Sequence, residues 1–214
     1  KPIGPHRKAQ TVAAMMMARN MIRADKSIKN VLIATGYRNS DLIDYNDEAA
    51  RFMLYLAAGG AACIVQRDCP RNTILEGHCI SDGSFSGDVL VPAGGAVKPM
   101  TKEALLNNEY RVTCVDQEGM KKRLEMKSLS NWLICIDKAL EKSGYNRKDV
   151  NYAAMIMVKK SAHDYLMNQL GLKPEQTRYL GEFGHHGQND QLLSLEMALE
   201  ENLVKDGDLV LMIS

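Results

Sequence analysis

The sequence has 214 residues, of which 45% are hydrophobic and 25% are charged, the composition of an ordinary globular protein. Lysine and arginine number 27, and aspartate and glutamate number 26, so the formal net charge is +1. This balance supplies no overall attraction to nucleic acid or to an anionic membrane. No apolar run reaches the roughly 18 residues of a membrane-spanning helix. We therefore expect neither nucleic acid nor a membrane as a partner.

The five cysteines form an odd, widely spaced set without a CxxC pair. This spacing excludes a zinc ribbon and a thioredoxin-like motif, and it favours free thiols in a reducing compartment. The sequence begins with Lys1 and ends at Ser214, directly after the apolar run 209–213. From these two ends we expect an incomplete part of a longer polypeptide.

Residues 10–25 predict a helix that is apolar on nearly every side, a pattern typical of a helix inside a protein. The apolar run 31–35 ends at Gly36 and predicts a short buried strand, and a second apolar run covers 61–65. Residues 66–110 are rich in turn-forming residues and show no convincing period. We interpret them as a loop-rich excursion between two folded halves.

A strand candidate at 111–115 precedes a helix whose apolar side chains between 129 and 140 repeat with a helical period. We expect Ser128 or Ser130 to cap the start of this helix and Gly144 to end it. Further helices alternate with continuous apolar strands along the rest of the chain. This alternation predicts an α/β protein with a largely parallel sheet that is covered on both faces.

The polar loop 184–190 is the strongest candidate for chemistry, because it holds His185 and His186 between two glycines directly before a helix. The free N–H groups at a helix start favour developing negative charge, and an imidazole beside them can donate to an oxyanion or relay a proton. The alternative is that the glycines serve only the geometry of the helix entry and the histidines are solvated. His163, in the first turn of an earlier helix, is a weaker candidate. Adjacent histidines do not easily point at one ion, so we expect no metal site.

Residues 151–214 resemble the C-terminal half of the thiolase superfamily, and most closely that of 3-oxoacyl-[acyl-carrier-protein] synthase III. The likeness is carried by three short motifs in this order: Leu170-Gly171-Leu172, Gly184-His185-His186-Gly187 and Lys205-Asp206-Gly207-Asp208. The helix 10–25, the strand 31–35 and the Gly59-Gly60 turn follow the order of the N-terminal half. The resemblance implies a layered αβαβα fold with mixed, largely parallel sheets. It divides the chain into the remainder of an N-terminal half (1–65), an excursion (66–110) and a C-terminal half (111–214).

The same resemblance implies a transferase of fatty acid or polyketide-like biosynthesis, and thus of lipid metabolism, that condenses an acyl-CoA with a malonyl-carrier thioester. Acyl-CoA and acyl carrier protein would be its partners, coenzyme A and phosphopantetheine thioesters its substrates, and no cofactor would be permanently bound. The family is typically a cytoplasmic homodimer. It uses a cysteine at the start of the buried helix, because a thiolate there has a lowered pKa. A histidine and an asparagine then stabilise the enolate.

This sequence departs from the family pattern at all three positions. The helix begins near Lys8-Ala9-Gln10 without a cysteine, and the family histidine falls at Ile156 or Met157. His185 stands at the family asparagine, where it would still supply a donor, so it is the best candidate. Two hypotheses remain open: an acyltransferase whose nucleophile lies outside this sequence, or a degenerate homologue that binds an acyl thioester or a partner subunit without condensation. An unrelated α/β protein is a third.

Overall fold

The computed structural model describes residues 10–214. The α-helices are α1 (Gln10–Ala24), α2 (Lys102–Leu106), α3 (Gln117–Ser143), α4 (Lys160–Leu170) and α5 (Asp190–Glu200). The strands are β1 (Asn30–Tyr37), β2 (Gly59–Gln66), β3 (Val89–Leu90), β4 (Thr113–Cys114), β5 (Tyr152–Met155) and β6 (Val210–Ile213). Short 3-10 helices connect them, including η6 (Gly187–Asn189) immediately before α5.

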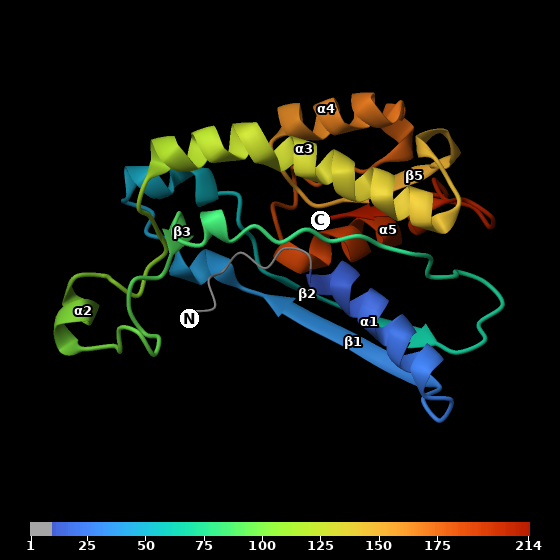
Figure 1. Ribbon diagram of the computed structural model, residues 1–214. Helices are drawn as coiled ribbons and strands as arrows, with labels where there is room; N and C mark the ends of the chain where they lie inside the picture. The colour runs from blue at the N-terminus through green and yellow to red at the C-terminus, as the bar shows by residue number, and fades with distance from the viewer. Residues whose placement is uncertain (1–9) are drawn as a thin grey trace.

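These elements stack as α–β–α–β layers (Figure 1). Helices α3 and α4 cover one face of the β5–β6 sheet, and α5 covers its other face. Helix α1 packs on the β1–β2 pair, and α5 also contacts β2, so α1 and α5 together form the middle layer. The α/β fold with mixed sheets is as predicted. Parallel pairing does not dominate, however: β5–β6 is parallel, whereas β1–β2 and β3–β4 are antiparallel.

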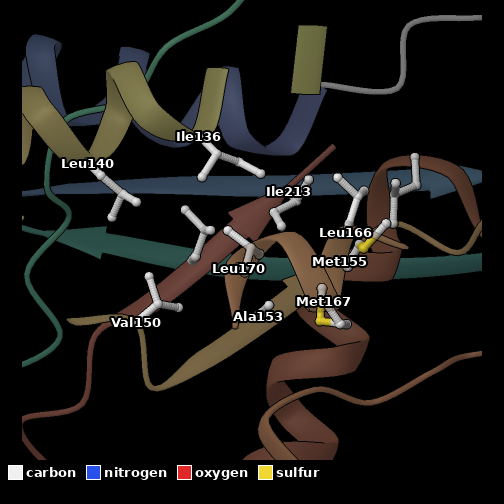
Figure 2. Close-up of a cluster of buried hydrophobic side chains, with 11 residues drawn as sticks. Ile136, Leu140, Val150, Ala153, Met155, Leu166, Met167, Leu170 and Ile213 are labelled. Carbon is white, nitrogen blue, oxygen red and sulfur yellow. The ribbon is translucent and has the colours of Figure 1, made fainter. Parts of the chain in front are cut away.

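The β5–β6 sheet is covered on both faces. All four residues of β5 are buried, because apolar side chains from α3, α4 and α5 meet it from both faces. Figure 2 shows one of these contacts, in which Ile136 and Leu140 of α3 and Leu166 of α4 approach Met155 and Ile213. The continuous apolar run of β5 predicted a strand buried on both faces, and the structure has this arrangement.

The β1–β2 pair, by contrast, is covered on only one face within the described residues. Its side chains alternate between partly buried and exposed along β1, so the prediction of a buried strand at 31–35 is wrong. Leu32 and Ile64 lie directly opposite one another on the open face and are 67% and 68% exposed. The apolar run alone did not distinguish a strand covered on one face from a strand covered on both.

Helix α1 is also less buried than predicted. It buries Ala18 and Ile22 against Val65 of β2, yet Met17 is 64% exposed and Met21 is 47% exposed. One helix face suffices to cover the inner side of two strands, while Arg19 and Arg23 bind Glu76 and leave Met17 and Met21 exposed. The prediction of a helix buried all round is therefore wrong for this chain.

Helix α3 is longer than its apolar period indicated. It starts with Asp116 as N-cap, whose carboxylate accepts from the Gly119 N–H at 2.9 Å, rather than at Ser128 or Ser130. Gly144 ends the helix in the left-handed conformation, as predicted, with φ of 79°.

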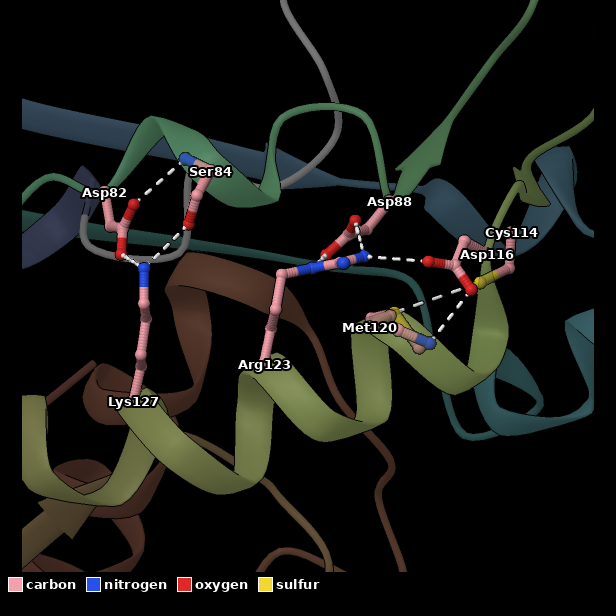
Figure 3. A network of polar contacts seen from close by, with 9 residues as sticks. Asp82, Ser84, Asp88, Cys114, Asp116, Met120, Arg123 and Lys127 are labelled. Carbon is pink, nitrogen blue, oxygen red and sulfur yellow. Dashed lines mark hydrogen bonds and ion pairs between the residues drawn. The ribbon is translucent and has the colours of Figure 1, made fainter.

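Two ion pairs connect the polar first half of this helix to the loop-rich segment 66–110 (Figure 3). Arg123 binds Asp88, and Lys127 binds Asp82 at 2.8 Å. These tertiary contacts, which a local period does not report, explain the extra turns of the helix. Within the described residues, no helix is long and apolar enough to cross a membrane.

Candidate functional site

The loop 184–190 is part of the C-terminal half of the chain, but it lies directly against strands β1 and β2 of the N-terminal half. Its close approach requires glycine at two positions. Gly184 and Gly187 have φ of 77° and 64°, and a Cβ atom on Gly187 would lie 2.3 Å from the Tyr37 ring of β1. The His185 N–H also donates to the Tyr55 carbonyl at 2.7 Å. The glycines thus serve geometry, as one interpretation held, but the histidine between them is not solvated.

His185 and Asp190 form a buried pair in this loop. The His185 Nδ1 atom lies 2.6 Å from Asp190 Oδ2, and the two residues are 3% and 0% exposed. The carboxylate also accepts the backbone N–H groups of Met157 at 2.8 Å and His186 at 2.7 Å. It lies at the first residue of α5, where the helix dipole favours negative charge. Three donors and the helix start therefore hold the carboxylate in one orientation.

The other ring nitrogen of His185 has no partner. Nε2 is buried and makes no hydrogen bond, while the imidazole packs beside the Tyr37 ring with centroids 5.6 Å apart. When Nδ1–H donates to a carboxylate, Nε2 of a neutral imidazole is left as an acceptor. Asp190 thus fixes the tautomer and orientation of His185, the arrangement that a general base requires.

The following residues tie the loop to the N-terminal half. The Gln188 side chain donates to Thr35 Oγ1 at 2.6 Å and to the Gly36 carbonyl at 3.1 Å. Thr11 of α1 donates to the Gln188 carbonyl at 2.5 Å, and Asn189 donates to the Gly59 carbonyl at 3.0 Å. These bonds hold the His185–Asp190 pair at the junction of α1, β1 and β2.

A cavity of about 170 Å³ lies at the same junction. It is lined by residues of α1 and β1: Gln10, Thr11, Ala14, Ile33, Ala34 and Thr35. Thr35 lines the cavity, and Tyr37, two residues on and on the same face of β1, contacts His185. None of the lining residues belongs to the loop 184–190, but Thr35 joins the wall of the cavity to that loop through its hydrogen bond with Gln188.

His163, the second candidate, lies elsewhere. It is 4% exposed on the inner side of α4, with Nε2 3.4 Å from Thr177 Oγ1 and its ring edge-on to Tyr179. Burial lowers the pKa of His163, and Asp164 opposes that shift only in part. Among the described residues, no hydrogen bond or ion pair joins His163 to the loop 184–190. The structure therefore does not bring the two predicted site residues together.

Ile156 and Met157, where the sequence resemblance places the family histidine, present no side chain that could act on a proton. Both are buried, and only the Met157 backbone N–H reaches the site, through Asp190. Of the expected nucleophile position, Lys8 and Ala9 lie outside the described residues, while Gln10 lines the cavity. Within residues 10–214, no group of three His, Cys, Asp or Glu side chains is placed to hold a metal ion.

The sequence analysis missed Asp190. The sequence did contain a pattern that points to Asp190: it is an aspartate five residues after a glycine-flanked histidine, and it opens the next helix. We considered the helix start as a site for an anion of the substrate, whereas the protein fills it with its own carboxylate. Gln188 and Asn189 were missed because their partners are 130 or more residues away in the sequence.

The fold and this site define the class of protein: a layered, thiolase-like α/β fold with a polar loop before its last helix. Solved structures of 3-oxoacyl-[acyl-carrier-protein] synthase III support this class. The one from Aquifex aeolicus VF5 matches with a TM-score of 0.76 and 19% identity, over 96% of this chain and 59% of that chain. The one from Pseudomonas aeruginosa PAO1 matches with a TM-score of 0.78 and 14% identity, over 96% of this chain and 60% of that chain.

Sequence comparison then identifies the family. Residues 9–83 match the family described as 3-Oxoacyl-[acyl-carrier-protein (ACP)] synthase III, and residues 140–214 match its C-terminal part. The curated beta-ketoacyl-[acyl-carrier-protein] synthase III of Aliarcobacter butzleri (strain RM4018) is 26% identical over 202 residues, 94% of this chain and 58% of that protein. The chain belongs to the 3-oxoacyl-[acyl-carrier-protein] synthase III family, which confirms the resemblance, and it spans little more than half the length of these relatives.

Proposed function

We propose that the protein is an acyltransferase of the 3-oxoacyl-[acyl-carrier-protein] synthase III type. It would take an acyl group from acyl-CoA and join it to a malonyl-carrier thioester, in fatty acid or related biosynthesis. A homodimer in the cytoplasm is part of this proposal, as are acyl carrier protein and coenzyme A thioesters as partners. The observation that carries it is the buried His185–Asp190 pair with Nε2 unpartnered, at the place where the resemblance puts the family asparagine.

The pair supports this chemistry through hydrogen bonding and charge. A protonated His185 would donate from Nε2 to the oxygen on which negative charge develops, and the Asp190 carboxylate would stabilise the imidazolium. A preorganised donor in a buried site is one of the larger contributions to acyl transfer. The start of α5 adds a favourable dipole.

The test is to incubate the purified protein with an acyl-CoA and a malonyl-carrier thioester, and to follow release of CO2 and formation of the 3-oxoacyl product. Intact mass measurement after acyl-CoA alone reports any covalent acyl adduct. We expect product from the native protein and a large loss in His185→Ala. Absence of product, adduct and acyl-CoA consumption would refute the proposal.

A non-catalytic homologue that binds acyl thioesters is the second candidate. The buried apolar pair Ile156 and Met157 favours it, since the resemblance places the family histidine there and neither side chain could replace it. Tight binding of acyl-CoA without adduct or turnover would identify this candidate. Binding is measured by calorimetry on the same preparation, so the two outcomes are separated directly.

A further inference from the structure

An irregular segment of the chain, residues 75–82, crosses between helices α1 and α3 (Figure 1), and we refer to it as the crossing segment. On the side of α1, Arg19 forms an ion pair with Glu76. Gly77 packs so closely on Met16 of the same helix that a Cβ atom added there would lie 2.5 Å from the Met16 sulfur. The crossing segment is therefore in direct contact with α1.

The contacts on the other side set the register of the crossing segment along α3. Near the end of the helix, Lys142 Nζ lies 3.2 Å from His78 Nδ1, and earlier in the helix Lys127 binds Asp82 at 2.8 Å. Rising residue numbers in the segment thus meet falling numbers in the helix, so the two run antiparallel. A residue of α3 between these two lysines and on the same face as Lys142 is therefore expected to face the middle of the segment.

Two free cysteines meet at this place. Cys135 lies on α3 one heptad before Lys142, so both side chains are on the same face of the helix, and Cys79 directly follows His78. Burial raises the pKa of Cys135, the Cys79 thiol raises it further by charge repulsion, and a hydrogen bond from the Ile80 N–H opposes both. Because the Ile80 nitrogen is only two bonds from Cys79 Cα, this hydrogen bond places the Cys135 sulfur within reach of the Cys79 side chain.

We propose that Cys79 and Cys135 form a reversible disulfide, a thiol-oxidation site that fixes the crossing segment on α3. In a reducing compartment such a pair is held as two thiols, and it closes when the supply of an oxidised low-molecular-weight disulfide rises. The reactant of the site is thus a small disulfide such as oxidised glutathione. The inference uses no residue of the loop 184–190 and does not rest on the proposed function.

The oxidation proceeds by two thiol–disulfide exchanges. Cys79 is exposed and reacts first: its thiolate attacks one sulfur of the small disulfide, whose S–S bond breaks and releases one thiol. The Cys135 thiolate then attacks the Cys79 sulfur of the mixed disulfide and displaces the second thiol. The protein gives up two electrons and two protons, and the small disulfide takes up both as two thiols.

Closure of the disulfide connects the two helices more firmly. It joins α3 covalently to a segment that Arg19 and Met16 already hold on α1. It also encloses residues 79–135 in a covalent loop, which restricts the unfolded chain and so favours the folded state. Oxidation is therefore expected to raise the melting temperature of the protein, and reduction to reverse the change.

The experiment uses the purified protein, first fully reduced and then incubated with oxidised glutathione. Intact mass measurement and peptide mapping without reductant report which cysteines are joined, and thermal unfolding compares the oxidised and reduced forms. The variants are Cys79→Ser and Cys135→Ser. Cys69→Ser is the matched control, because Cys69 is a free and exposed cysteine like Cys79.

We expect the native protein to lose the mass of two hydrogen atoms and to yield one cross-linked peptide pair that contains Cys79 and Cys135. Its melting temperature should rise by about 5–15 °C and return on addition of dithiothreitol. Cys69→Ser should behave in the same way. Cys79→Ser and Cys135→Ser should show no rise, and Cys135→Ser should accumulate a glutathione adduct on Cys79, because the second exchange has lost its thiol.

Peptide mapping of the native protein tests the inference even if a serine variant fails to fold. A stable glutathione adduct without the cross-link, a disulfide that involves another cysteine, or no reaction at all would overturn the assignment of the pair. A Cys79–Cys135 disulfide that leaves the melting temperature unchanged would overturn its role in fixing the segment.

Discussion

Two buried histidines in this protein have an aspartate beside them, and only one of the two pairs forms a site. On helix α4, Asp164 follows His163 directly, but its carboxylate is exposed, lies 3.4 Å from the ring and is shared with Lys160. In the loop 184–190, Asp190 is five residues from His185, completely buried and 2.6 Å from the ring. The comparison shows what orients a histidine–aspartate pair. The carboxylate must be buried and must accept backbone N–H groups, and closeness in the sequence is not enough.

The largest effect that would sharpen this comparison is on turnover. His185→Ala should lower acyl transfer by about 100-fold or more, because it removes the imidazole that Asp190 orients and whose Nε2 is unpartnered. His163→Ala should leave the rate per folded molecule within a few fold, since its ring contacts Thr177 and Tyr179 instead. Steady-state rates with acyl-CoA measure both. Equal losses would contradict the assignment of His185.

The next effect concerns folding. Asp190→Ala leaves two backbone N–H groups and a buried imidazole without their acceptor, and we expect it to lower the free energy of unfolding by about 3–5 kcal/mol. Asp164→Ala removes only an exposed carboxylate and should change the free energy of unfolding far less. Urea unfolding of both variants checks this difference. A cost of similar size in the two would mean that the buried pair adds no stability.

Glycines provide a smaller contrast between the same two regions. Gly187→Ala should lower the free energy of unfolding by about 1–3 kcal/mol. The new Cβ would collide with the Tyr37 ring, and the left-handed backbone adds its own cost. Gly171→Ala at the end of α4 has a similar φ of 69° but open space around it, so only the backbone cost of about 1 kcal/mol remains. Thermal unfolding of the two variants distinguishes packing from backbone strain. A larger loss for Gly171→Ala would contradict the tight approach of the loop.

The smallest expected effect is the pH dependence that His163 contributes. Its pKa in the unfolded chain is near the ordinary value of 6.5, and burial lowers it in the folded protein. The unfolded chain therefore binds more protons below about pH 6.5, so stability falls as the pH falls through that value toward the lower folded pKa. His163→Gln should flatten this part of the curve of unfolding free energy against pH. An unchanged slope would show that other groups account for it.

Local patterns predicted most elements of the fold. Continuous apolar runs located β1, β2, β5 and β6, and Gly144 located the end of α3. They did not predict how each element is covered, because that depends on which segments pack against it. The antiparallel β1–β2 pair and the early start of α3 are of this kind: strand pairing and the ion pair between Arg123 and Asp88 are tertiary contacts.

The candidate site was predictable only in part. Histidines between glycines before a helix made the loop 184–190 a candidate, and the family resemblance then made His185 the best candidate in it. Asp190 was within reach of the same reasoning, whereas Gln188 was not. Its partners Thr35 and Gly36 are more than 150 residues away, and nothing in the local sequence indicates them.

The open face of the β1–β2 pair has a practical consequence for work with this protein. Leu32 and Ile64 form a cross-strand aliphatic pair, and both side chains are mostly exposed in the described part of the chain. Exposed apolar side chains on a β-strand promote aggregation at high protein concentration. Replacing Leu32 and Ile64 by threonine should keep the β propensity and lower the tendency to aggregate. The opposite face of the strands, where Thr35 and Tyr37 contact the loop 184–190, is left unchanged.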